Sequence, residues 1–137
     1  MSSRKERLHL RFCMTFSLAD EYEYLRGCER GTDQDNYPGS EPPEANVTVN
    51  NDPATLKWSH LVAASTSVLT TQNADCTQCD PQADSVPTGT VGLFEGAHHY
   101  HCGVFRPEFN CKMRAVDDPF CAVCREHIQT ILKPYLP

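Results

Sequence analysis

The chain has 137 residues, which is the size of about one domain. Its formal charge of −6 at pH 7 argues against nucleic acid or an anionic membrane as the main partner, since both require clustered Lys and Arg. The sequence also lacks an apolar run of about 20 residues, which excludes a transmembrane helix. Leu, Ile, Val and Phe make up only about a fifth of the chain, so the supply of core residues is small.

Eight cysteines are many for a reduced cytosolic protein of this length and favour an oxidised, secreted setting. Asn46-Val47-Thr48 matches the acceptor pattern for N-glycosylation, which agrees with secretion. No signal peptide is evident, because His9 and Arg11 interrupt the apolar stretch near the N-terminus. We therefore expect the export signal of the intact protein to lie outside this sequence.

Residues 20–52 carry nine acidic and two basic side chains together with several Pro, Gly and Asn, which predicts a long solvated loop. Asp52-Pro53 is a good start for a helix, and the apolar residues after it fall near one face. This pattern predicts a helix over about 53–69.

Residues 70–92 are rich in Thr, Gln, Asp, Pro and Gly, and predict a loop pinned by its own sulfurs. Asp118-Pro119 repeats the helix-start pattern, and apolar residues at helical spacing follow it as far as Lys133-Pro134. The clearest predicted helix is therefore 119–132. No strand-like run exceeds about five residues, so we expect an α+β fold rich in helix and loop.

The cysteines leave two arrangements open. Two CxxC pairs, Cys76/Cys79 and Cys121/Cys124, would suit a tetrahedral structural zinc site. The alternative is disulfide bonding, with Cys102 and Cys111 bracketing a short loop. Eight cysteines allow 105 connectivities, so the sequence assigns none of them.

A histidine cluster lies beside the second half of the cysteines. His98, His99 and His101 could ligate a metal or shuttle protons, but no helical histidine pair accompanies them. A half-exposed structural cluster is the simpler interpretation. Near it, Glu95 and Arg106 could line a pocket or form a buried ion pair.

Five segments in order resemble the IgA peptidase family of zinc metallopeptidases. The likeness runs from about residue 15 to 130 and covers the C-terminal half of the family domain. The segments are Phe16-Ser17-Leu18-Ala19-Asp20-Glu21-Tyr22, Gly92-Leu93-Phe94-Glu95-Gly96-Ala97-His98-His99-Tyr100, Gly103-Val104-Phe105-Arg106-Pro107, Cys111-Lys112-Met113-Arg114 and Pro119-Phe120-Cys121-Ala122-Val123-Cys124.

The resemblance implies roles for several of these residues. In the family, two histidines and an aspartate of the motif HExxHxxGxxDE bind Zn²⁺, and the glutamate activates water. Asp20 then corresponds to the third zinc ligand, with Glu21 and Tyr22 as its motif neighbours, and Met113 to the methionine beneath the zinc. The remaining residues expected near the substrate cleft are Glu95, Tyr100 and Arg106.

The other positions of the motif depart from the family. Leu10 and Met14 stand where the two histidines belong, Arg11 where the glutamate belongs, and Ser17 where the glycine belongs. A catalytic zinc needs three protein ligands and an open water position, so we expect no tight catalytic site and no peptide hydrolysis.

Two functions follow as hypotheses. The first is a fragment or degenerate relative of a secreted zinc metalloendopeptidase, whose intact form would act on protein or peptide substrates. Its divisions would be a non-matching leader at 1–14, the C-terminal part of a metzincin-like domain at 15–133, and a tail at 134–137. The second is a non-catalytic extracellular binding or structural module, held together by disulfides or by a four-cysteine zinc site.

Overall fold

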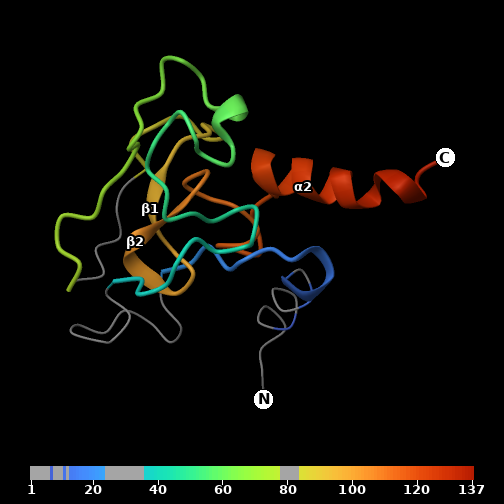
Figure 1. Ribbon diagram of the computed structural model, residues 1–137, viewed down its shortest axis with the longest axis horizontal. Helices are drawn as coiled ribbons and strands as arrows, with labels where there is room; N and C mark the ends of the chain where they lie inside the picture. The colour runs from blue at the N-terminus through green and yellow to red at the C-terminus, as the bar shows by residue number, and fades with distance from the viewer. Residues whose placement is uncertain (1–6, 8–10, 12, 24–35, 78–83) are drawn as a thin grey trace.

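The computed structural model describes residues 7, 11, 13–23, 36–77 and 84–137. Strands β1, Phe94–Ala97, and β2, Tyr100–Arg106, form an antiparallel hairpin at the centre of the body (Figure 1). Helix α2, Ala122–Leu132, extends away from that body towards the C-terminus (Figure 1). Two short 3₁₀ helices, η1 (Ser59–Leu61) and η2 (Lys133–Tyr135), and the helical residues 13–16 are further helical parts of the described residues. The expected mixed α+β class is confirmed, and no described helix has the length and apolar character needed to span a membrane.

Isolated β-bridges join residues outside the hairpin to each of its two strands. Thr48 pairs with Phe105 of β2, and Thr71 pairs with Phe94 of β1. Every residue of β1 is buried, and six of the seven residues of β2 are buried or half-buried. The strand β2 is longer than the five-residue limit expected from the sequence. That expectation was wrong because both faces of β2 are covered, so its pattern does not alternate.

The main core lies between the hairpin and the start of α2. It joins apolar residues from all parts of the described chain, and the indole Nε1 of Trp58 donates to the carbonyl of Gly92 at 2.8 Å. Its buried members are Leu18, Leu56, Trp58, Leu93, Phe105, Cys111, Met113, Cys121, Val123 and Cys124. A smaller cluster of Ala19, Val47, Ala97 and Val104 lies on the other side of the hairpin.

The predicted C-terminal helix is confirmed, with a later start. Cys121, rather than Asp118, is the N-cap, and its sulfur accepts from the amide of Cys124. The carboxylate of Glu108 accepts from the amide of Ala122 at 2.7 Å, which places negative charge at the positive end of the helix. Only Val123 and Cys124 of α2 are fully buried, so its first turn anchors the helix.

The helix predicted over 53–69 does not form. Leu56 and Trp58 are both buried, with Lys57 between them pointing to three loop carbonyls. Residues two apart cannot share one face of a helix but do so in an extended chain. Tertiary packing of the indole therefore overrides the helical pattern, and only the turn of η1 remains.

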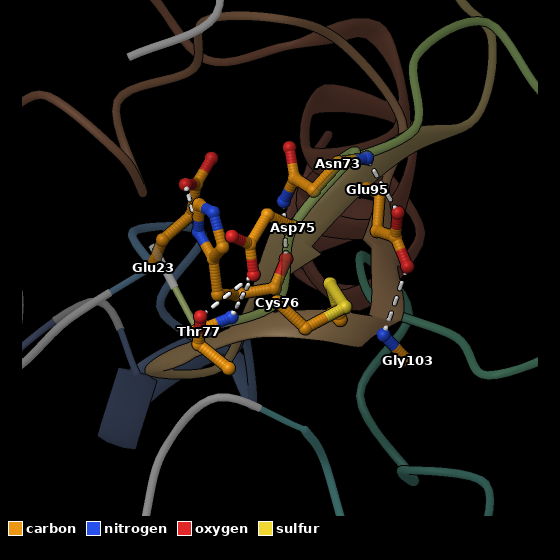
Figure 2. The surroundings of a disulfide bond; sticks show 9 residues. Glu23, Asn73, Asp75, Cys76, Thr77, Glu95 and Gly103 are labelled. Atoms are coloured by element: carbon orange, nitrogen blue, oxygen red, sulfur yellow. Dashed lines mark hydrogen bonds and ion pairs between the residues drawn. A yellow bond between two sulfur atoms is a disulfide. The ribbon is translucent and has the colours of Figure 1, made fainter. Parts of the chain in front are cut away.

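Two loop predictions also need correction. Residues 46–48, inside the segment expected to be solvated, are fully buried, because Thr48 pairs with β2. Cys76 is not held within its own loop but forms a disulfide with Cys102 of β2 (Figure 2). Cys79 lies outside the described residues, as does His9.

We predict that the Cys76–Cys102 disulfide is a major source of stability. It closes a loop of sequence separation 26, so replacing Cys76 by Ser should lower the free energy of unfolding by about 3 kcal/mol. Urea denaturation monitored by circular dichroism measures this change. Cys13→Ser, which removes a free thiol, is the control. Equal unfolding midpoints for Cys76→Ser and the unsubstituted chain would contradict the prediction.

Candidate functional site

The carboxylate of Asp20 is held by three side chains. The hydroxyl of Tyr22 donates to Oδ2 at 2.9 Å, Nε2 of His99 lies 3.1 Å from the same oxygen, and the thiol of Cys13 donates to Oδ1 at 3.5 Å. Burial raises the pKa of Asp20, but the hydrogen bonds from His99 and Tyr22 outweigh it and leave that pKa below its usual value. The same surroundings raise the pKa of Cys13 to about 12, through burial first and the Asp20 charge second. Asp20 is thus a fixed carboxylate with protein partners on both oxygens.

Backbone strain gathers around this carboxylate. Ser17, His98 and His99 have φ values of 51°, 52° and 68°, in the left-handed region that non-glycine residues rarely adopt. Ser17 follows the helical residues 13–16 and ends that helical segment at the position where the family motif has glycine. His98 and His99 form the two-residue turn of the hairpin, which such φ values suit. Each strained residue costs of order 1–3 kcal/mol, and such residues concentrate at functional sites.

Main-chain hydrogen bonds fix the segment that carries Asp20. The amides of His98 and His99 donate to the carbonyls of Asp20 and Tyr22 at 2.9 and 3.0 Å. From the other side, the amide of Glu21 donates to the carbonyl of Met113 at 2.9 Å. Met113 is fully buried and its carbonyl holds this segment, while its role beneath a zinc ion stays a prediction.

Glu21 points into the core rather than towards Asp20. It is fully buried, and Asn46 Nδ2 donates to its Oε1 at 2.9 Å. Burial is the main reason that the pKa of Glu21 is raised well above its usual value. Its neighbours include three buried thiols, those of Cys111, Cys121 and Cys124.

The pKa values of the three thiols are shifted in opposite directions. Hydrogen bonding with Cys121 and Cys124 lowers the pKa of Cys111 to about 3. The same bonds, seen from the partner sulfurs, raise the pKa of Cys121 and of Cys124. Cys111 is therefore the first of the three to exist as a thiolate.

The residues expected at a substrate cleft have partners within the fold. The carboxylate of Glu95 accepts from the amides of Asn73 at 2.7 Å and Gly103 at 3.1 Å, beside the disulfide (Figure 2). Arg106 is 1 % exposed, and burial lowers its pKa to about 10. Tyr100 is half-buried, with its ring edge-on to that of Tyr37 at 5.2 Å.

Arg106 does not form an ion pair with Glu95, which was one of the two alternatives that the sequence left open. Its Nη1 lies 3.3 Å from Oε1 of Glu23 and donates to the carbonyls of Glu95 and Gly96. The side chain instead joins the segment 19–23 to β1, because the guanidinium offers several donors at once.

The histidines divide between the turn and the core. His98 and His99 are half-buried in the turn, as a structural cluster would be, whereas Nδ1 of the buried His101 pairs with Glu23 at 3.0 Å. His60 pairs with Glu126 at the surface, and His127 with the carbonyl of Phe16. Both histidines therefore have partners within the fold.

Asn46 has a structural position in the folded chain. Its side chain is fully buried, accepts from the amide of Ala19 and donates to the carbonyl of the same residue, each at 2.8 Å. The expectation of a glycosylation site is corrected here, because a glycan cannot be attached to an amide enclosed by the core.

The cysteine set proposed for zinc also changes. Cys76 is oxidised with Cys102, so it cannot ligate a metal together with Cys121 and Cys124. Cys111, which the disulfide alternative placed at one end of a short loop, is a free thiol beside the CxxC pair. The sequence signal for this arrangement was the CxxC pair itself, whereas nothing in the sequence marked Cys111 and Glu21 as its neighbours.

The residues present do not fit the catalytic zinc of the resembling family. Met14, at the position of the second histidine, is 77 % exposed, and Arg11, at the position of the general base, is exposed as well. Both oxygens of Asp20 already have protein partners. We therefore derive no catalytic step through such an ion.

Comparison with known families finds a partial match to a peptidase family. The model described as IgA Peptidase M64 matches residues 79–132 of the chain. The match covers less than half of the chain and includes the hairpin, Met113 and all of α2. It confirms the resemblance over that segment, while Asp20 and Glu21 lie outside it. No curated protein matches the chain.

We predict that Glu95 acts as a structural bridge. In Glu95→Gln, the amide nitrogen would face one of the two backbone N–H donors, which would lose its acceptor. The free energy of unfolding should fall by about 1–3 kcal/mol, measured by urea denaturation. The matched change at the surface, Glu126→Gln, should stay within about 0.5 kcal/mol. An equally small effect at both positions would leave Glu95 available for another role.

Proposed function

We propose that the chain is a non-hydrolysing relative of the secreted zinc metalloendopeptidases, equivalent to the C-terminal part of a metzincin-like domain. The observation that carries this proposal is the state of Asp20, whose two oxygens bond to Tyr22, His99 and Cys13. A third metal ligand in that position would have to exchange these partners for the ion. Neither histidine of the motif is present to help hold it.

The retained part of the domain is the backbone that supports Asp20, the residue at the position of the third zinc ligand, and not the residues that carry out hydrolysis. The turn at His98 and His99 and the carbonyl of Met113 hold the segment around Asp20 from two sides. In a domain with the two histidines and the glutamate, this support would aim the carboxylate at the zinc, which would polarise the scissile carbonyl of a protein substrate.

Secretion belongs to the same proposal. The Cys76–Cys102 disulfide supports an oxidising compartment, where such bonds persist. For an intact member of the peptidase family, the substrate would be a protein or peptide.

The test combines loss and gain of function. The full chain, supplied with zinc, should show no turnover of a casein substrate. The triple variant Leu10→His, Arg11→Glu, Met14→His should bind one more zinc per chain than the unsubstituted protein, and Asp20→Asn in that background should remove the additional ion. Zinc content after gel filtration gives the count.

Alanine at the same three positions is the matched control and should add no zinc. Casein turnover by the unsubstituted chain that a chelator abolishes would overturn the inactivity. An unchanged zinc count in the triple variant would overturn the assignment of Asp20 as third ligand.

A further inference from the structure

We infer that Glu21, Cys111, Cys121 and Cys124 bind a structural zinc ion, and we refer to these four residues as the Cys₃Glu cluster. Their ligand atoms lie within 4.8 Å of one another, and all four residues are buried. They come from three separate parts of the chain: the segment after Asp20, the turn that contains Met113, and the start of α2. Asp20 is not among them.

Two of the recorded distances within the cluster match the edges of a zinc tetrahedron, and a third is about 0.5 Å longer. With Zn–S bonds of about 2.3 Å, two sulfurs of a tetrahedral site lie about 3.8 Å apart, and a sulfur and a carboxylate oxygen about 3.5 Å apart. The sulfurs of Cys111 and Cys124 are separated by 3.7 Å. Oε1 of Glu21 lies 3.5 Å from the sulfur of Cys124 and 4.0 Å from that of Cys121.

One carboxylate oxygen of Glu21 lacks a hydrogen-bond partner among the described residues. Glu21 is fully buried, and its Oε2 accepts no hydrogen bond from any described residue. A buried carboxylate without such partners is costly, and coordination of a cation is a common solution. Oε1 faces the sulfurs of Cys121 and Cys124 and also accepts from Asn46, so an ion bound there would neutralise the charge of a carboxylate whose other oxygen has no partner among the described residues.

The backbone around the sulfurs is arranged as in a closed thiolate site. The amides of Cys121 and Met113 point at the sulfur of Cys111, at 3.3 and 3.5 Å, and the amide of Cys124 points at that of Cys121, at 3.4 Å. Such N–H groups stabilise negative charge on sulfur and orient the ligands. The cluster places three thiols and a carboxylate around one point, which leaves no open position for a water and favours a structural over a catalytic ion.

The oxidation state of the chain points the same way. Cys76 and Cys102 are joined, while the three thiols of the cluster are reduced. The 3.7 Å between Cys111 and Cys124 is far longer than a disulfide bond of about 2.05 Å. Zinc coordination explains how three adjacent thiols stay reduced in a chain that forms disulfides, because bound thiolates are withdrawn from oxidation.

The test is metal content, which is independent of proteolysis. The full chain, refolded with zinc, should retain one zinc per chain through gel filtration. Replacing zinc by cobalt should give the near-ultraviolet charge-transfer bands of thiolate ligands and the visible bands of a tetrahedral ion. Peptide mapping after alkylation in denaturant with chelator should recover all three cluster cysteines as free thiols.

Variants assign the ligands. Cys124→Ala should weaken zinc binding by more than about 100-fold, since even outer-shell changes cost 10–100-fold. Cys13→Ser, the matched loss of a free thiol outside the cluster, should keep the ion. Because Cys124→Ala can also impair folding, Glu21→His is the second variant: it supplies a nitrogen ligand, and should keep the metal while shifting the visible bands of cobalt.

Three results would overturn the inference. One is a refolded chain that retains no zinc. Another is a disulfide that links two of the three cluster cysteines in the native protein. The third is a cobalt spectrum that Glu21→His leaves unchanged, which would remove Glu21 from the ligand set.

Discussion

The burial of Glu21 in a core of sulfurs constrains the rest of the structure. Its carboxylate must find partners, and it does so among Asn46, Cys121 and Cys124. The backbone amide of Glu21 donates to the carbonyl of Met113 and so fixes the position of the segment around Asp20 against the core. The loop before Thr48, the turn at Met113 and the first turn of α2 are thereby brought to one point, although the apolar core is small.

The same constraint sets the state of the neighbouring Asp20. Because consecutive side chains of an extended segment point in opposite directions, an inward Glu21 turns Asp20 outwards to the hairpin turn. There the carboxylate forms hydrogen bonds with His99 and Tyr22. The backbone amides that hold this segment come from His98 and His99, whose φ angles lie in the left-handed region. A carboxylate positioned so firmly is what a metal site uses as a ligand, and here protein donors occupy its oxygens.

The structural ion that we infer in the Cys₃Glu cluster and the absence of peptide hydrolysis that we propose are compatible properties of one chain. The first depends on Cys111, Cys121 and Cys124, which lie inside the segment matched by the IgA Peptidase M64 model, together with Glu21. The second depends on the histidine positions, where this chain has Leu10 and Met14. A domain can therefore lose its chemistry while its support remains folded.

The sequence by itself determined the local features: the C-terminal helix, from its helical spacing and its stop at Lys133-Pro134, and the CxxC pair at the start of that helix. Only the tertiary structure decided which distant residues contact these local features. Glu21 lies 100 and 103 positions from Cys121 and Cys124, and the helical pattern over 53–69 gave way to the burial of Leu56 and Trp58. Periodicity and spacing report on neighbours along the chain, whereas contacts between distant segments arise only when the core forms.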